Sequence, residues 1–266
     1  MRLLVIIFSL YLFSGCSSKI NSSPQKPTTT IQNIQPTTSV EDEDDEFLEE
    51  FDEELEVEEK SDPFSGYNRA MTTFNDKLYE YVLSPVSNGY KKVVHKEVRS
   101  SVKKFFHNLL YPIRLVNNLL QTKFKNSWEE TERFVINTTI GVFGLFDPAK
   151  SYFGLEPHEE DFGQTLGYYG VGSGPHIVLP FFGPSNLRDT FSIYPDSLLN
   201  PVDYYSQRDY NLAHNTKETI GLTVFKTVNN TSLSDDQYSK IKKDAIDLYP
   251  YLRDIYEQHR NQQIKE

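Results

Sequence analysis

Residues 161–189 read DFGQTLGYYGVGSGPHIVLPFFGPSNLRD, a stretch with six glycines and three prolines among many large apolar side chains. Glycine and proline interrupt regular structure, so helices and strands within it can only be short. The apolar side chains must nevertheless be buried or meet lipid. Backbone polar groups in an apolar loop are costly unless protein, water or a cavity satisfies them. This combination indicates the wall of a passage.

The start of the chain has the layout of a lipoprotein signal. Arg2 precedes an apolar run from Leu3 to Phe13, and small residues lead to Cys16, the single cysteine of the chain. The apolar run is too short to span a bilayer but fits a cleaved secretory signal. We therefore expect a signal peptide over residues 1–15 and acylation, for example with palmitate, at Cys16. The alternative is a cleaved signal followed by an incidental cysteine.

Residues 16–60 have the composition of an unfolded tether. A part rich in Ser, Thr, Pro and Asn is followed by fourteen Asp or Glu residues between Glu41 and Glu59. Such a segment buries too little apolar surface to offset the entropy of ordering. As a flexible linker it would have a root-mean-square length of about 35–40 Å. Four apolar residues at helical spacing within the acidic part leave a partner-induced helix as the alternative.

Residues 61–266 form the expected folded domain. The whole chain has a formal charge of −11, but this part has 23 Lys or Arg and 24 Asp or Glu residues. It is therefore nearly neutral, which does not favour nucleic acid as a partner. Its length is sufficient for a sizeable core. No stretch after Cys16 is long and apolar enough to predict a membrane-spanning helix.

Apolar residues recur at steps of three and four through most of this domain, which predicts a mainly α fold. Asp62–Pro63 and Ser84–Pro85 each have the form of a helix start, and Ser127–Glu130 has the form of a capping box. Pro112 predicts a kink or a restart. Further elements are expected as a helix beginning at Pro184–Ser185, a helix from about Tyr205 to Val228, a helix from Ser234 that Pro250 breaks, a last helix over Tyr251–Gln258, and a short extended pair near Ile177–Phe181.

The sequence contains no recognisable catalytic set. Ser173 lies between glycines, but the nucleophile elbow needs glycine at the positions that Val171 and Pro175 occupy. His158 is followed by acidic residues and lacks the second histidine of a helical zinc pair. No dinucleotide-binding glycine motif and no Walker lysine appears. We therefore expect no enzymatic activity, no cofactor and no metal site.

In the order and spacing of its residues, the central stretch resembles the MlaA/VacJ family of outer-membrane lipoproteins. The resemblance extends over nearly the whole folded domain. The chain departs from the family pattern at His176, at Phe13 and in the length of its acidic tether. The matching residues are Asp161–Gly167, Gly170–Gly172, Gly174–Pro175, Leu179–Pro180, Gly183–Ser185 and Arg188–Asp189 in the centre, with Asp62–Arg69, Met71, Phe74–Asn75, Pro85–Val86, Val98–Arg99, Phe105–Leu109, Val116–Gln121, Arg133–Phe134, Asn137–Gly141 and Asp247–Gln258 around it.

The resemblance implies a ring-like bundle of amphipathic helices in the inner leaflet of the outer membrane, on its periplasmic face, beside a trimeric outer-membrane porin. Its Gly- and Pro-rich apolar loop region would line a central amphipathic passage. Mislocalised phospholipid would cross that passage to a soluble periplasmic carrier, which maintains the lipid asymmetry of the outer membrane. The residues expected to line the passage are Phe162, Gly163, Gln164, Leu166, Gly170, Gly172, Gly174, Pro175, Leu179 and Pro180.

A membrane-facing surface is expected on the helices that begin at Asp62 and Pro112 and on the apolar stretch from Ile140 to Phe146. Aromatic residues favour a membrane interface but also fill ordinary cores, and that stretch could be a buried turn or a membrane-dipping hairpin. Two other functions stay open, a non-transport scaffold or binding lipoprotein and a lipid-cleaving enzyme. The expected membrane-facing residues are Phe74, Ile140, Val142, Phe143, Leu145 and Phe146.

Overall fold

The computed structural model describes residues 62–203 and 211–266. These residues all belong to the compact unit Lys60–Glu266. The predicted signal peptide, Cys16 and the tether lie outside the described residues. The same holds for the beginning of the helix that was expected from about Tyr205.

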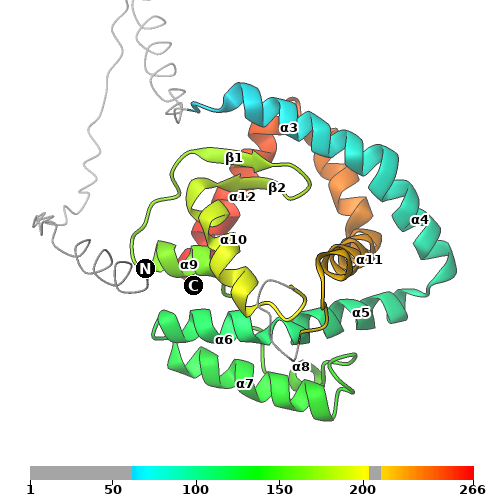
Figure 1. The fold of residues 1–266 in the computed structure, drawn as a ribbon, viewed down its shortest axis with the longest axis vertical. Coiled ribbons are helices and arrows are strands. Elements are labelled where there is room, and N and C mark those ends of the chain that lie inside the picture. The colour runs from blue at the N-terminus through cyan, green and yellow to red at the C-terminus, as the bar shows by residue number, and fades with distance from the viewer. Residues whose placement is uncertain (1–61, 204–210) are drawn as a thin grey trace, which may run out of the picture. The chain divides into compact units, whose positions relative to one another are not determined.

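Helices make up most of the described chain, which confirms the mainly α prediction. In Figure 1, α3, α4, α5 and α6 follow one another round the periphery of the folded unit, and α9, α10 and a two-stranded hairpin lie inward of them, an arrangement that fits a ring-like bundle. The elements are α3 (Ser65–Leu78), η2 (Tyr79–Leu83), α4 (Ser84–Val93), α5 (Lys96–Leu109), α6 (Tyr111–Leu120), α7 (Phe124–Thr139), α8 (Pro148–Phe153), α9 (Phe162–Tyr168), β1 (His176–Leu179), β2 (Gly183–Asn186), α10 (Leu187–Leu199), α11 (Thr216–Asp244) and α12 (Leu248–Lys265).

The elements α3, η2 and α4 form one continuous helical rod. Helix α4 begins at Ser84 and ends at Val93, close to the prediction, but Ser84 is not an N-cap, because the chain enters α4 directly from the π-helix η2. Pro85 explains the π-helix. A proline ring collides with the carbonyl four residues earlier in an α-helix, and the wider π-helical turn gives it room.

Helix α7 begins at Phe124, three residues before the predicted capping box. The hydroxyl of Ser127 donates to the carbonyl of Lys123 at 3.1 Å, within the first turn. Glu130 is fully buried and accepts a hydrogen bond of 2.7 Å from Nε of Arg114 on α6. The capping-box prediction is therefore wrong, because a long-range ion pair uses the glutamate that the motif assigns to the helix start.

Helix α11 runs unbroken from Thr216 to Asp244, so the predicted start at Ser234 is also wrong. Two buried side chains hold this helix against α5. The amide of Asn229 donates to the carbonyl of Arg99 at 3.0 Å, and the Arg99 guanidinium donates to the carbonyl of Ser232. These contacts with α5 stabilise the helical conformation of the residues around Ser234, which would otherwise favour a helix cap.

Other boundaries agree more closely with the sequence. Pro112 lies in the first turn of α6 and confirms the predicted restart. Pro250 lies in the first turn of α12, where a missing N–H costs little, and does not end a helix. Asn186 caps α10, two residues after the predicted start. The extended pair is confirmed as an antiparallel hairpin in which Ile177 pairs with Ser185.

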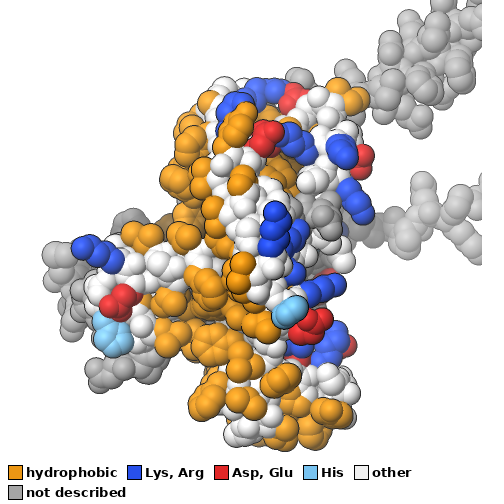
Figure 2. Space-filling model, turned by 90° about the vertical axis from the view of Figure 1, so that its right-hand side faces the viewer, with side chains coloured by type: hydrophobic (Ala, Val, Ile, Leu, Met, Phe, Trp, Pro, Cys, Tyr) orange, Lys and Arg blue, Asp and Glu red, His pale blue; other side chains and the backbone are white. Residues whose placement is uncertain are grey.

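The interior of the described domain is mostly polar. Eight apolar residues are buried, Pro148 and Pro201 included, against 26 polar or charged ones, while 36 large apolar residues are exposed. Globular proteins in water normally bury apolar residues and pair the few polar ones that they enclose. Figure 2 shows the result on one face, where hydrophobic side chains gather along one side and Lys and Arg along the other. The packing of this chain is thus inverted relative to that of a water-soluble protein.

Candidate functional site

The glycine-rich stretch begins with a capped helix. The Asp161 side chain accepts from the backbone N–H of Gln164 at 2.8 Å, and the Gln164 side chain accepts from the backbone N–H of Asp161 at 3.0 Å. This reciprocal pair satisfies donors that have no partner inside the helix. It fixes the point at which the chain enters α9.

Arg260, on α12, joins α9 to α10. Its guanidinium donates two hydrogen bonds to Asp161, of 2.8 and 2.9 Å, and two to Asp189, of 2.9 and 3.1 Å. Tyr256 adds a hydrogen bond of 2.6 Å to Asp189. Burial alone would raise the pKa of Asp189, but the hydrogen bonds from Arg260, Arg188 and Tyr256 hold it below its ordinary value. Asp189 is therefore charged, and its hydrogen bonds to Arg260 and Tyr256 hold α10 against α12.

Gly163 and Gly167 allow α12 to approach α9 closely. A Cβ at Gly163 would lie 2.4 Å from Oδ1 of Asp189 and 2.6 Å from Nη2 of Arg260. A Cβ at Gly167 would lie 2.6 Å from Cδ1 of Ile264. Gly163 is required by packing, since the two groups that it faces are held in place by other hydrogen bonds. A side chain at Gly167 would instead need the end of the Ile264 side chain to move.

Asp196, on α10, has an environment unlike that of Asp189. It accepts hydrogen bonds from the backbone N–H of Phe162 at 3.1 Å and from the side chain of Asn117 at 3.1 Å, and no cation pairs with it among the described residues. Burial, with a smaller contribution from neighbouring Asp161, raises the pKa of Asp196 to about 6. This carboxyl group changes its charge just below neutral pH.

The segment from Gly170 to Pro175 is the exposed part of the stretch. Gly170 and Gly174 have positive φ values of 83° and 68°. Gly172 has neither a positive φ nor any atom within 4 Å of a Cβ placed on it. The segment is tied to the first turn of α10, where the N–H of Arg188 donates to the carbonyl of Ser173 at 3.1 Å. It is thus a fixed loop with open space beside it.

Two asparagines of α3 hold the hairpin in place. Asn68 donates to the carbonyl of His176 at 3.0 Å and accepts from the N–H of Val178 at 2.8 Å. Asn75 donates to the carbonyl of Leu179 at 2.9 Å and accepts from the N–H of Phe181 at 2.8 Å. Seven residues of helix and three of strand both span about 10 Å, so the two amides match the exposed strand edge.

The predicted passage residues are divided between these parts. Gly163 and Gln164 are buried in the contact among α9, α10 and α12. The residues from Gly170 to Pro180 lie instead on the loop and the hairpin. In the structure Phe162, Leu166, Pro175, Leu179 and Pro180 are half-buried, and Gly170, Gly172 and Gly174 are exposed.

The apolar stretch after α7 forms a tight turn. Val142, Phe143 and Gly144 have consecutive positive φ values of 53°, 57° and 85°, a conformation that is rare for a β-branched residue. A Cβ at Gly144 would lie 2.4 Å from the Asn108 side chain. Of the predicted membrane-facing residues, Phe74, Ile140, Val142, Phe143 and Phe146 are exposed and Leu145 is half-buried.

In the described parts of the chain, no helix combines the length and apolarity needed to cross a membrane. The exposed apolar residues are instead distributed over many elements. They include Trp128 on α7, Tyr152 on α8, Phe191 on α10 and Val224 on α11. Such a surface fits contact with lipid or a partner along its flanks rather than a membrane-spanning segment.

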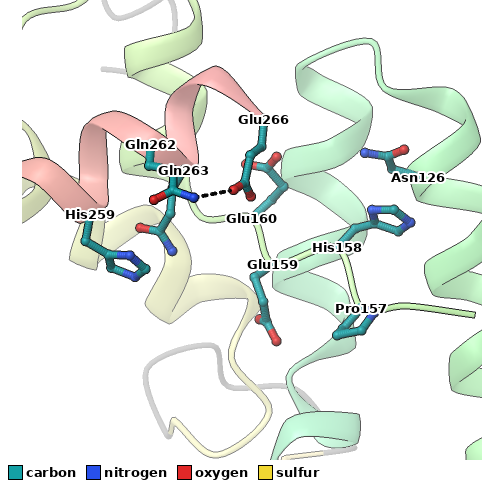
Figure 3. A pocket seen from close by; sticks show the side chains of 9 residues that line it. All are labelled: Asn126, Pro157, His158, Glu159, Glu160, His259, Gln262, Gln263 and Glu266. Atoms are coloured by element: carbon teal, nitrogen blue, oxygen red, sulfur yellow. Dashed lines mark hydrogen bonds between the residues drawn. The ribbon is translucent and has the colours of Figure 1, made fainter. Parts of the chain in front are cut away.

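A polar pocket of about 230 Å³ lies between the last turns of α12 and the segment that precedes α9 (Figure 3). Several of its lining groups are already paired. Oε1 of Glu160 accepts a hydrogen bond of 2.7 Å from Nζ of Lys123, and Nε2 of His158 lies 2.6 Å from Oε2 of Glu129. No group of three or more His, Cys, Asp or Glu within residues 62–203 and 211–266 could hold a metal ion. The lining residues are Asn126, Pro157, His158, Glu159, Glu160, His259, Gln262, Gln263 and Glu266.

Similarity to known proteins agrees with this architecture. Residues 60–263 match the model of the MlaA lipoprotein family. An uncharacterised protein of Rickettsia bellii is 35% identical over 205 residues, which are 77% of each chain. The intermembrane phospholipid transport system lipoprotein MlaA of Escherichia coli is 38% identical over 135 residues, 49% of this chain and 53% of that protein.

The same fold occurs in a solved structure that concerns the structural basis for maintenance of bacterial outer membrane lipid asymmetry. It matches with a TM-score of 0.65 and 29% sequence identity, over 77% of this chain and all of the matched chain. The described elements thus correspond to a known arrangement. The alignment with the Escherichia coli protein, in contrast, spans only about half of either chain.

Proposed function

This chain belongs to the MlaA lipoprotein family, and we propose that it carries mislocalised phospholipid out of the outer membrane to a soluble periplasmic carrier. Its relatives in Escherichia coli and Shigella flexneri are named as lipoproteins of an intermembrane phospholipid transport system. The activity on this proposal is transfer of an intact lipid, which needs no catalytic group and no cofactor.

The inverted distribution of side chains supports this proposal most directly. Exposing 36 large apolar residues to water would be costly, at about 25 cal/mol for each Å² of apolar surface. In a membrane the same side chains lie against acyl tails, and buried polar groups must pair inside the protein. The Asn, Arg and Asp side chains of the interior do so, for example in the Arg260 network. This distribution supports the proposal that the folded domain lies in the inner leaflet of the outer membrane.

The lipid passage is proposed beside the loop Gly170–Pro175 and the adjoining Leu179–Pro180. Gly170 and Gly172 leave open space there, and half-buried Phe162 and Leu166 supply apolar surface from α9. A phospholipid needs an apolar wall for its tails and polar groups for its head. Gly163 and Gln164 are both buried, so on this proposal they hold α9 in position and do not line the passage themselves.

The anchor and the partners complete the proposal. Acylated Cys16 would fix the chain to the membrane, and the tether would let the folded domain reach a porin trimer at some distance from the anchor. The exposed turn around Phe143 and the aromatic residues of α3 and α7 would face acyl tails. The carrier would accept lipid from the periplasmic side.

The test uses Gly172→Val, because the structure shows room for the new side chain and no backbone strain at this position. We expect unchanged thermal stability but increased outer-leaflet phospholipid in cells that depend on this protein. Gly66→Val is the matched control, since Gly66 also has open space and lies on α3, away from the loop. If both variants transport lipid as well as the wild type, the passage does not run beside Gly172.

Native mass spectrometry of the detergent-extracted protein separates the proposed function from the two alternatives. A transport protein should retain intact glycerophospholipid. A protein that never retains lipid would instead be a scaffold or binding lipoprotein. Release of fatty acid or head group from added phospholipid would identify a lipid-cleaving enzyme.

A further inference from the structure

Four exposed lysines lie at the end of α4 and along the first nine residues of α5, at Lys92, Lys96, Lys103 and Lys104. None of them forms an ion pair with any residue that the structure describes. Between Lys91 and Leu109 the sequence has a single acidic residue, Glu97. The folded domain is nearly neutral, so these lysines form a local concentration of positive charge in which Glu97 is the single acidic residue.

The same two helices expose valines on another face. Val86 and Val93 are seven residues apart, two turns along the rod, and are 51% and 82% exposed. On α5, Val98 is 52% exposed and follows Lys96 by two residues, which places it about 160° away round the helix. On α5 the lysines therefore lie on nearly the opposite side from Val98, whereas on α4 Lys92 lies about 100° round the helix from Val93 and about 120° from Val86.

The third face of these helices is the buried one. Ser87 of α4 and Arg99 and Phe106 of α5 are buried. The hydroxyl of Ser87 donates to the carbonyl of Val228, and the guanidinium of Arg99 donates to Ser232, both on α11. With this face fixed against α11, the valines and the lysines project to the two sides of the folded unit. In Figure 2, hydrophobic side chains gather mainly along one side of the visible face and basic ones along the other.

We propose that the corner of α4 and α5 binds the anionic head groups of membrane phospholipids. An amphipathic helix that places apolar residues among acyl tails and lysines at head-group level has this arrangement. An acidic protein segment would pair with the lysines but leave the valines exposed to water. A lipid surface satisfies both faces of the same helices at once. The corner then sets the depth of the folded domain and enriches anionic lipid beside it.

The inference rests on the proposed membrane location, and vesicles of defined composition test it. The purified full-length chain is diluted from detergent onto vesicles of phosphatidylcholine, with or without phosphatidylglycerol, and co-flotation is measured. The test variant is Lys103→Gln with Lys104→Gln. The control is Lys240→Gln with Lys243→Gln, which removes the same charge from two exposed lysines of α11.

We expect the wild-type chain and the control to prefer vesicles that contain phosphatidylglycerol, with a preference that weakens as salt is added. Each lysine near an anionic surface contributes about fivefold to partitioning, so the test variant should lose about 25-fold of this preference. Its binding to phosphatidylcholine alone should not change, because the valines remain. Circular dichroism should show the same helix content in all three proteins.

Equal preference for phosphatidylglycerol in the test variant and the control would overturn the inference and leave the transport proposal standing. A wild-type preference that appears only after residues 41–59 are deleted would make the acidic segment the occupant, and would also overturn it. Failure of the transport proposal has a different signature, namely absence of co-purified phospholipid while the preference for anionic vesicles persists.

Discussion

Gly163→Ala should destabilise the domain although it adds a single methyl group. The new Cβ would lie 2.4 Å from Oδ1 of Asp189 and 2.6 Å from Nη2 of Arg260, both far inside contact distance. Neither group can move freely, because Arg260 also binds Asp161 and Asp189 also binds Tyr256. The methyl group must therefore push apart the ion pair that joins α9, α10 and α12.

The size of the effect follows from the contacts that are lost. Breaking a buried ion pair costs about 3–5 kcal/mol. About 1 kcal/mol of this loss in stability is offset, because Gly163 lies within α9 and alanine favours a helix more than glycine does. The free energy of unfolding should fall by about 2–4 kcal/mol. For a domain of about 200 residues this corresponds to a melting temperature lower by about 4–16 °C.

The assay is thermal unfolding of purified variants in the same detergent, followed by circular dichroism. Gly172→Ala is the matched control, because Gly172 has open space and no positive φ, and its melting temperature should stay within about 2 °C of the wild type. If Gly163→Ala melts at the temperature of Gly172→Ala, the ion pair does not hold the three helices together and our account of Gly163 is wrong.

Three further predictions concern other parts of the chain. Cys16→Ser should abolish incorporation of a palmitate analogue in metabolic labelling, and persistent labelling would refute the anchor. Asn75→Ala removes both hydrogen bonds to the hairpin and should cost about 1–3 kcal/mol, with faster hydrogen exchange at the amide of Phe181; exchange at the wild-type rate would argue against this role. The pKa of Asp196 is about 6 in the folded protein and 3.8 in the unfolded chain. The contribution of Asp196 to the free energy of unfolding is therefore present at low pH and is lost as the pH rises between these two values. Asp196→Asn should therefore be more stable than the wild type at pH 7, by up to about 3 kcal/mol, and should match it below pH 4; an equal difference at both pH values would contradict the shifted pKa.

The sequence predicted the helices better than their ends. Periodicity identified the helical segments, and Pro112 correctly predicted a restart. Helix α4 does begin at Ser84, but the starts expected at Ser127 and Ser234 were wrong, because both serines lie inside longer helices. Ser127 bonds back within its own helix, and the Glu130 of its motif pairs with Arg114. Local patterns do not contain such long-range partners.

The sequence drew attention to the glycine-rich stretch, and its role as a lipid passage stays a prediction. The glycine-rich stretch was identified, but the sequence treated its glycines alike, whereas the structure separates packing at Gly163 from an open loop at Gly172. The partner of Asp189 could not be foreseen, because Arg260 lies 71 residues away. The roles of Asn68 and Asn75 were missed as well. Their spacing of seven was visible, but its meaning requires the hairpin edge that they face.

The polar interior changes how the stability of this protein should depend on temperature. Unfolding normally raises the heat capacity, because newly exposed apolar surface contributes about +0.45 cal/K/mol per Å² while polar surface contributes about −0.26. Here 26 of the 37 buried residues that the structure describes are polar, so the negative contribution of polar surface is larger than usual and the net change in heat capacity is smaller. The curve of unfolding free energy against temperature should then be flatter, and cooling should weaken this fold less than it weakens a protein with a hydrocarbon core.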